Sequence, residues 1–308
     1  MSRAVQFESF GGPALLRVND VPTPQAGAGQ VRVRVTAAGL NPMDWVMTSD
    51  AETAARFGLS LPCGVGTDYA GVVDQVGEGV AGFAVGDRVF GGAVSRAVAD
   101  HVVVDGTGTI AAGGVAHHTP DGVGDRTAAV LTIAGSTASA ALAVVDPGPG
   151  DTLLVGGAGG GVGVFVVQLA RLAGAGVIGT GSASSAGALR ALGAEPVPYG
   201  EGLVERVRAL APAGITAAVD LFGTDTALAA RDLGVPDARI TTIADRVEGI
   251  RPANGAHAAP GALDEIARLV AAGQLRVPIA ASFPVDRIRE AVELQAGRHV
   301  HGKVVIDL

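Results

Sequence analysis

The spacing of hydrophobic and polar residues changes near residue 125. Before this point, short stretches alternate apolar and polar positions, as in VRVRVTAAG at 31–39, and glycine turns join GVVDQVGEGV to GDRVF. Alternation with a period of two predicts half-buried strands. The first third of the chain is therefore predicted to be a small, largely antiparallel β-rich unit, in which Asp105 to Gly114 has the composition of a loop.

From about Asp125 onward, apolar runs alternate with alanine-rich helical windows. This alternation is typical of βαβ units, which build a parallel sheet. A helix is predicted at Leu203 to Leu210, where apolar residues recur at helical spacing opposite charged ones. The predicted strands are Thr152 to Val155, Gly176 to Gly179, Pro196 to Tyr199, Ala217 to Phe222 and Arg239 to Ile243.

The chain after about Pro260 changes its pattern again. A helix, LDEIARLVAAG, ends at Gly273 as helices with a glycine C-cap do, and VPIAASF, DRIREAVELQ and KVVIDL then follow as strand, helix and strand. We expect this segment to return and complete the first domain. The predicted α/β architecture is a β-rich domain at 1–124 and 261–308, with a doubly wound parallel-sheet (Rossmann) domain at 125–260.

Composition and charge narrow the possible partners. Hydrophobic residues make up 48% of the 308 residues and charged residues 17%, which suits a large buried core. The net charge of -8 and the absence of basic runs argue against a nucleic-acid partner. The one cysteine, Cys63, rules out an internal disulfide framework and a multi-cysteine zinc site, and it suits a reducing cytoplasm.

Two features bear on membranes and export. Glu8 interrupts the apolar stretch that a signal peptide would need, so the sequence predicts a cytoplasmic protein. Three uncharged stretches lie between Arg126 and Arg190, but they are rich in Gly, Ala, Ser and Thr, and their glycine cluster would break a membrane-spanning helix. Buried parallel strands with covering helices explain them without a membrane.

The strongest local motif is DTLLVGGAGGGVGVFVVQLAR at 151–171, which predicts strand, glycine turn and helix. In this setting, Gly160 and Gly161 allow a pyrophosphate to approach the backbone, and Gly163 allows the helix to pack closely against the strand. The helix N-terminus, near Val162, offers free N–H groups to phosphates. Ala158 takes the first position of the usual three-glycine pattern. The alternative is a glycine-rich turn that binds nothing.

The residues after the turn bear on the choice of dinucleotide. NAD sites usually carry an acidic residue about 20 positions further on, but no Asp or Glu lies between Gly163 and Glu195. Hydroxyl groups and a nearby cation can hold the 2′-phosphate of NADPH, and Ser182, Ser184, Ser185 and Arg190 offer them. The sequence thus favours NADPH over NADH, unless the serines only cap the next helix and Arg190 faces solvent.

Longer motifs resemble a known family across nearly the whole chain. They are AAGLNPMDW at 37–45, GTDYAGVVDQVGEGVAGFAVGDRVF at 66–90, the glycine turn with Gln168, and GKVVI at 302–306. Together they resemble the zeta-crystallin-like quinone oxidoreductase branch of the medium-chain dehydrogenases/reductases. The resemblance implies a GroES-like catalytic domain, a Rossmann domain, a nicotinamide bound between the two, and a homodimer.

The same resemblance implies that no metal is bound. Zinc-dependent relatives carry a cysteine where this chain has Asn41 and a histidine where it has Thr67. Without a Lewis acid, hydride transfer is easiest to an acceptor that is already electron-poor, such as a quinone or another α,β-unsaturated carbonyl. We therefore expect a zinc-independent reductase whose substrate is a small molecule of this kind.

Several site residues are implied by the resemblance. Asn41, Asp44 and Trp45 would form the catalytic part of the site. Alternatively, Asn41 and Asp44 only form a turn around Pro42, and Trp45 belongs to the core. Arg298 and Lys303 resemble basic positions that approach the cofactor. The predicted cofactor-binding residues are Asn41, Thr137, Ala158, Gly160, Gly161, Val162, Gly163, Ser182, Ser185, Tyr199, Phe222, Gly223, Ile243 and Ala244.

Three functions agree with these observations. The leading hypothesis is hydride transfer from NADPH to a quinone or enone, with water as the source of the final proton. A second is a non-catalytic NADPH-binding dimer, because a fold does not fix a function. A third is a pathway-specific enoyl reductase or cyclase whose bulky intermediate is accommodated by the 105–114 loop.

Overall fold

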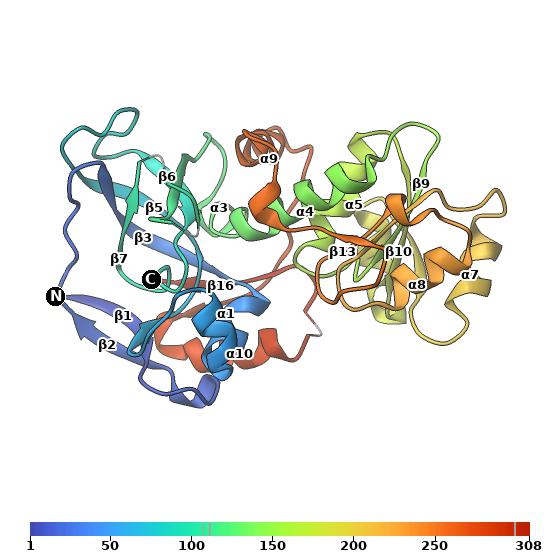
Figure 1. Cartoon of the computed structure of the whole chain (residues 1–308). Coiled ribbons are helices and arrows are strands. Elements are labelled where there is room, and N and C mark those ends of the chain that lie inside the picture. Colours follow the sequence, from blue (N-terminus) through green and yellow to red (C-terminus); the bar gives the residue numbers. More distant parts are fainter. Residues whose placement is uncertain (107, 111, 299) are drawn as a thin grey trace. The chain divides into compact units, whose positions relative to one another are not determined.

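The computed structural model describes residues 1–106, 108–110, 112–298 and 300–308. Its contacts divide the chain into two compact units. Unit 1 comprises Met1–Ile133, Leu263–Ala271 and Ile279–Leu308, and unit 2 comprises Ala134–Ala262 and Ala272–Pro278. Figure 1 colours their elements in chain order. Within the described residues, no helix has the length and hydrophobicity needed to span a membrane.

Unit 2 is built around a six-stranded parallel sheet with strand order β11-β10-β9-β12-β13-β14. Counted from the first strand of the unit, this is the order 3-2-1-4-5-6 of the dinucleotide-binding sheet, so the predicted doubly wound fold is confirmed. The strands are β9 Thr152–Gly156, β10 Gly176–Gly181, β11 Glu195–Pro198, β12 Ala217–Asp220, β13 Ile240–Thr242 and β14 Arg251–Pro252.

The five predicted strands of this sheet correspond to β9 through β13. They were predictable because a sheet buried on both faces needs nearly continuous apolar runs. The sixth strand, β14, is absent from the sequence prediction. It has two exposed residues, one of them Pro252, so no apolar run marks it.

Helices of unit 2 pack on the sheet through small and apolar side chains. The predicted helix at Leu203 to Leu210 is α7, and it buries Leu203 and Val207 in one core cluster with Leu154, Ile178 and further sheet residues. The other helices follow the same alternation with strands. They are α4 Thr132–Val145, most of which lies in this unit, α5 Gly163–Leu172, α6 Ala186–Ala191 and α8 Asp225–Asp232.

Unit 1 carries the β-rich part of the chain. A mostly antiparallel sheet has the order β15-β16-β3-β5-β6-β8, with β7 also pairing with β3, and a smaller sheet has the order β2-β1-β4. The C-terminal strand β16 pairs with β3, where Ile306 lies opposite Ala38. The strands are β1 Ser2–Phe7, β2 Arg17–Val21, β3 Gln30–Leu40, β4 Cys63–Gly64, β5 Asp68–Val76, β6 Arg88–Gly92, β7 His101–Asp105, β8 Val115–His118, β15 Ile279–Pro284 and β16 Lys303–Asp307.

The helices of unit 1 are short and few of them were predicted from the sequence. Those after Pro260 were predicted, because their apolar positions recur at helical spacing. Among the described residues, the helices lying mostly in this unit are α1 Pro42–Ser49, α2 Ala51–Arg56, α3 Asp125–Ala128, α9 Ala262–Ala271 and α10 Ile288–Ala296. Short 3₁₀ helices in the two units lie at Pro13–Leu15, Ala183–Ser185, Asp237–Arg239, Gly255–His257 and Val285–Arg287.

The division into units differs from the predicted boundaries at three places, the smallest being residues 261–262, which were predicted for the first domain and lie in unit 2. Residues 125–133, predicted for the second domain, lie in unit 1, because α3 contacts β3, β5 and β6. Residues 272–278, predicted for the first domain, lie in unit 2, where the Gln168 side chain bonds both the N–H and the carbonyl of Arg276. In the predicted 105–114 loop, residues 107 and 111 lie outside the described residues.

Candidate functional site

The glycine-rich turn directly follows β9. Gly157 has a φ of +68°, a left-handed conformation that favours glycine, and its N–H donates to Thr180 Oγ1 at 3.0 Å. Ala158 is fully buried. A Cβ on Gly163 would lie 2.4 Å from Gly157 O and 2.5 Å from Ala158 O, so the start of α5 packs directly on the turn. The predicted role of Gly163 in close packing agrees with this geometry.

The N-terminus of α5 is open to a negatively charged group. Its N-cap residue, Val162, provides no side-chain cap, and no acidic residue stands in the first turn. Within the part of the chain that the structure describes, the N–H groups of Gly161 and Val162 donate to no other residue. Unpaired N–H groups and the positive end of the helix dipole are what a diphosphate needs, so the turn fits this group.

Other predicted cofactor residues lie at the edge of the sheet where β9 and its neighbouring strands end. Because β9 to β13 are parallel, their carboxyl ends meet at one edge, and ligands of doubly wound sheets bind there at the point where the strand order reverses. Each of these strands is followed by a predicted residue: Ala158 after β9, Ser182 after β10, Tyr199 after β11, Phe222 and Gly223 after β12, and Ile243 and Ala244 after β13.

Asp220, at the end of β12, is a residue that the sequence prediction missed. Its buried carboxylate accepts the N–H groups of Phe222, Gly223, Thr226 and Ala227 at 2.8–3.1 Å. It thereby fixes the loop between β12 and α8 beside the glycine turn. The signal was the pattern of an aspartate ahead of a helix that begins in TDTALAA, where such a side chain caps free N–H groups.

The serines after β10 differ in their exposure. Ser185 is buried and its hydroxyl donates to Ser182 O at 2.8 Å, but neither Ser182 nor Ser185 caps the helix that follows it through its side chain. Ser184 is exposed and Ser182 partly exposed, with 2.9 Å between their hydroxyl oxygens. The Arg190 guanidinium lies 3.6 Å from the Glu195 carboxylate. The hydroxyls of Ser182 and Ser184 are therefore the groups best placed to receive a ligand on this segment.

Two further predicted residues of unit 2 also have defined surroundings. Tyr199 is 64% exposed directly after β11, so its ring is available to a ligand. Thr137 lies on α4, and a Cβ on Gly255 would approach Thr137 Oγ1 to 3.0 Å. Thr137 therefore lies against the 3₁₀ helix Gly255–His257 within unit 2.

Unit 1 holds a cluster of buried polar groups where β3 ends and α1 begins. Asn41 is the N-cap of α1, Pro42 follows it, and the Asp44 carboxylate accepts the Asn41 N–H at 2.8 Å. The alternative of a local turn around Pro42 thus holds in part, since the two residues form a helix cap. The Thr67 hydroxyl donates to Asp44 Oδ1 at 3.1 Å, so Asp44 also links α1 to the chain before β5.

Asp68 and Lys303 complete this cluster. Asp68 Oδ2 accepts the Asn41 amide Nδ2 at 3.0 Å, and Oδ1 accepts the Ile133 N–H at 3.0 Å. The Lys303 ammonium, from the start of β16, donates to Leu40 O at 3.2 Å and to Asn41 Oδ1. We call Asn41, Asp44, Thr67, Asp68 and Lys303 the buried polar cluster. Each of these side chains is at most 3% exposed.

Burial shifts the ionisation of the three charged members. Loss of water raises the pKa of Asp44 to about 7, and the neighbouring Asp68 charge adds to this shift. Burial raises the pKa of Asp68 to about 6, against the opposing effect of the Lys303 charge. Burial also lowers the pKa of Lys303, although both carboxylates oppose this change. The cluster is thus poorly solvated and electrostatically coupled.

Trp45 has two kinds of contact. Its ring packs against the core cluster that contains Leu40 and Ile288, as the core alternative expected. The Arg298 guanidinium also lies 5.7 Å from the ring centroid, within the range of a cation–π interaction. Trp45 is therefore held between the core and a cation and is only partly buried.

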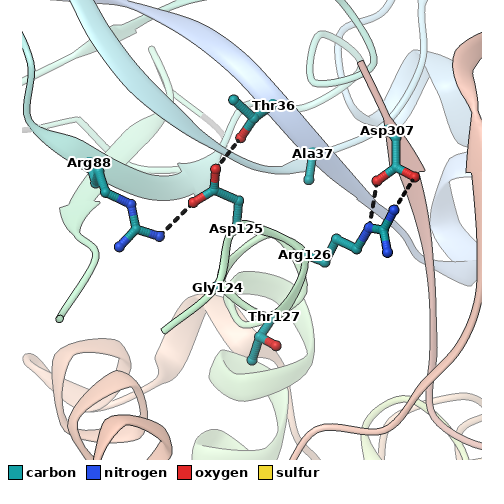
Figure 2. Close-up of a pocket in the computed structure, with 8 residues that line it drawn as sticks. All are labelled: Thr36, Ala37, Arg88, Gly124, Asp125, Arg126, Thr127 and Asp307. Carbon is teal, nitrogen blue, oxygen red and sulfur yellow. Dashed lines mark hydrogen bonds and ion pairs between the residues drawn. The ribbon is translucent and has the colours of Figure 1, made fainter. Parts of the chain in front are cut away.

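A separate surface pocket in unit 1 does not collect the predicted residues. It is lined by residues of β3, β6, α3 and β16, including Thr36, Arg88 and Asp125 (Figure 2). Arg88 pairs with Asp125 at 2.6 Å, and Arg126 pairs with Asp307 at 2.8 Å. Because its charged groups already satisfy one another, this pocket gives no argument for a ligand.

The arrangement of possible metal-ligating side chains is the next feature of the structure. Over residues 1–106, 108–110, 112–298 and 300–308, no group of three or more His, Cys, Asp or Glu side chains is arranged to hold a metal ion. In the buried polar cluster, the positive charge beside the carboxylates comes from the Lys303 ammonium.

Comparison with known proteins relates these observations to a family. The family model "Alcohol dehydrogenase GroES-like domain" matches residues 27–166, which confirms the predicted GroES-like fold, and the model "Zinc-binding dehydrogenase" matches residues 192–306. A quinone oxidoreductase of Pseudomonas aeruginosa is 30% identical over 341 residues, with 99% of each chain covered. The quinone oxidoreductase of Rattus norvegicus is 34% identical over 183 residues, which cover 58% of this chain and 53% of that protein.

Solved structures of the same fold also match this chain. The quinone oxidoreductase from Coxiella burnetii matches with a TM-score of 0.87 and 28% identity, covering 100% of this chain and 99% of that one. The CurK enoyl reductase matches with a TM-score of 0.86 at 22% identity, which shows a shared fold alone. The full-length match in sequence and the shared architecture show that this chain belongs to the quinone oxidoreductase family of the medium-chain dehydrogenase/reductase superfamily and is an oxidoreductase of that superfamily.

Proposed function

We propose that this protein transfers hydride from NADPH to a quinone or another α,β-unsaturated carbonyl, without zinc. The observation that carries the proposal is the uncapped N-terminus of α5, which follows a glycine turn at the point where the sheet order reverses. A dinucleotide diphosphate is the ligand that suits this combination of free N–H groups, helix dipole and close backbone approach. Quinone oxidoreductases of similar sequence support the class of acceptor.

The proposed preference for NADPH rests on the segment after β10. Ser182 and Ser184 offer hydroxyl groups, and no carboxylate follows Gly163 before Glu195. Hydroxyls donate hydrogen bonds to a phosphate, whereas a carboxylate would repel it. Ser185 and Arg190 contribute less to this argument, because the buried Ser185 hydroxyl bonds Ser182 O and Arg190 pairs with Glu195.

We expect Ser184→Asp to weaken NADPH binding relative to NADH by about 1–2 kcal/mol, because the new carboxylate would repel the 2′-phosphate. Dissociation constants for both dinucleotides measure this ratio. Ser282→Asp, on an exposed position of β15, introduces the same charge elsewhere and should leave the ratio unchanged. An unchanged ratio in Ser184→Asp would contradict the proposed phosphate site.

The proposed independence from zinc rests on the buried polar cluster. Asn41 and Thr67 provide neutral oxygen and nitrogen atoms, which are weak ligands for zinc compared with thiolate and imidazole. The Lys303 ammonium bonds Asn41 and would repel a cation at that position. These residues do not fit a catalytic zinc ion, so we derive no step through one.

The buried polar cluster can act through its fixed hydrogen bonds. As hydride reaches the acceptor, negative charge develops on its carbonyl oxygen, and an oriented N–H donor such as the Asn41 amide stabilises that charge. Asp44 and Thr67 hold the N-terminus of α1, on which Trp45 lies. Because Asp44 and Asp68 are fully buried, we assign the final proton to water.

The direct test is NADPH oxidation with a panel of quinones and enones. We expect acceptor-dependent oxidation that is unaffected by chelators. NADPH binding without oxidation by any member of the panel would favour the alternative of a non-catalytic binding protein. The homodimer implied by the family resemblance and the cytoplasmic location predicted from the sequence remain predictions.

A further inference from the structure

Lys303 is unusual both in the sequence and in the fold. Lysine and arginine together number 22 in this chain, and Lys303 is the single lysine among them. It is 3% exposed, whereas most basic side chains of the chain reach solvent. A chain whose other basic side chains of this class are arginines therefore places its one lysine ammonium in the buried polar cluster. A compact ammonium differs from a guanidinium in concentrating its donors on one small atom.

The contacts of Lys303 fix the orientation of the Asn41 amide. An ammonium can only donate hydrogen bonds, so the atom of Asn41 that it meets is the amide oxygen. The amide nitrogen then points to Asp68 Oδ2, at 3.0 Å, and an ionised carboxylate can only accept. The two partners reinforce each other, because each would meet the wrong atom if the amide turned over.

This arrangement leaves one donor available. The Asn41 nitrogen carries two hydrogens, and one of them is used by Asp68. Among the described residues, the second has no acceptor. Donation by Lys303 to the amide oxygen also polarises the amide and strengthens its remaining N–H as a donor.

We infer that Lys303 is a positioning residue that holds the Asn41 amide so that its free N–H is presented to a carbonyl oxygen of the bound ligand. This inference rests on the proposed function, since it requires that Asn41 faces the bound ligands. Two carbonyl groups have the required chemistry: the carboxamide of the nicotinamide ring and the carbonyl of the acceptor. Lys303 itself touches Asn41 and Leu40 and need not contact either ligand.

A double-mutant cycle tests whether Lys303 acts through Asn41. The variants are Asn41→Ala, Lys303→Met and the double variant, and the measured quantities are the dissociation constant of NADPH and kcat with a quinone. We expect Asn41→Ala to cost about 100-fold in the affected quantity and Lys303→Met about 10-fold. In the double variant, the loss should equal that of Asn41→Ala alone, because Lys303 has nothing left to position.

The two readouts identify the carbonyl group. Non-additive losses in NADPH affinity assign the N–H to the nicotinamide carboxamide, and non-additive losses in kcat assign it to the acceptor. Losses that multiply in both quantities, or an unaffected Lys303→Met protein, would overturn the inference while the proposed function stands. A wild-type protein that neither binds NADPH nor reduces any acceptor would instead overturn the proposed function.

Asp68→Asn provides a second variant of nearly unchanged size, in case Lys303→Met does not fold. A carboxamide can donate as well as accept, so the Asn41 amide would no longer be held in one orientation. We expect a loss in the same quantity as for Lys303→Met, and no further loss when Asn41→Ala is added. Arg126→Met, which breaks a surface ion pair in the same unit, is the matched control and should leave both quantities unchanged.

Discussion

Alanine at position 163 should abolish measurable dinucleotide binding and lower the free energy of unfolding by about 2–3 kcal/mol. The added Cβ would lie 2.4 Å from Gly157 O and 2.5 Å from Ala158 O, both backbone atoms of the turn. The turn and the start of α5 must then separate, which displaces the N–H groups of Gly161 and Val162. Calorimetric titration with NADPH measures the loss of binding, and denaturant unfolding measures the loss of stability.

Gly187→Ala is the matched control for this variant. Gly187 lies in α6, and a Cβ there would meet no atom within 4 Å. Replacing a helical glycine by alanine at an open position should stabilise the protein by about 0.5–1 kcal/mol. The same substitution thus has opposite expected signs at two helical glycines. Equal effects at the two positions would contradict the close packing of α5 on the turn.

The second large effect concerns the pH dependence of stability. Because burial raises the pKa of Asp44 to about 7, the folded chain keeps a proton that the unfolded chain releases near pH 4. The folded state then binds more protons than the unfolded state between these values, so stability falls as the pH rises from about 4 to about 7. The loss of stability that Asp44 causes is therefore absent below pH 4 and complete above pH 7.

Asp44→Asn removes this titration and keeps the size of the side chain. Its carboxamide oxygen can accept the Asn41 N–H, and its nitrogen can donate to Thr67. We expect the free energy of unfolding of the variant, relative to that of wild type, to rise by about 2–4 kcal/mol as the pH is raised from 4 to 8. Urea unfolding at each pH measures this difference. The charged neighbours Asp68 and Lys303 are present in both proteins, so their contributions largely cancel in the comparison.

Asp20→Asn is the control for this experiment, because Asp20 is exposed on β2. Its stability should follow that of wild type across the whole pH range. Equal pH slopes for wild type and Asp44→Asn would mean that Asp44 has the same pKa in the folded and unfolded chain, and so would contradict the raised pKa.

Local patterns were sufficient to predict the parallel sheet and its glycine turn. The strands β9 to β13 are apolar runs bounded by glycine and charged residues, and the turn after β9 needs residues without a Cβ. The residues that follow each strand could be assigned to one edge because parallel strands share a direction. The short strand β14 and the first helices carry no such periodic signal.

Contacts between distant residues could not be predicted in the same way. Asn41 and Lys303 are far apart in the sequence, and their contact depends on the pairing of β3 with β16. The burial of Asp68 depends on β5 lying in the interior of its sheet. The helix cap at Asn41, however, has a local signal. Asparagine is a preferred N-cap, proline is common at the first helical position, and an acidic residue three positions after the cap can accept its N–H.

Contacts formed in the fold also explain why only some of the serines predicted to bind the 2′-phosphate are accessible. Ser182, Ser184 and Ser185 are equivalent in the sequence, but the 3₁₀ helix Ala183–Ser185 turns Ser185 inward, where its hydroxyl bonds Ser182 O. Arg190 forms an ion pair with Glu195 at the start of strand β11. Only the fold distinguishes the hydroxyls that remain accessible from those that serve the structure.

Calorimetric titration of the purified protein with NADPH and NADH shows whether the glycine turn before α5 binds a dinucleotide diphosphate. We predict saturable binding of one dinucleotide per chain, tighter for NADPH, and its loss in Gly163→Ala but not in Gly187→Ala. An absence of binding heat for both dinucleotides with the wild-type protein, confirmed by an unchanged thermal unfolding temperature, would contradict the account.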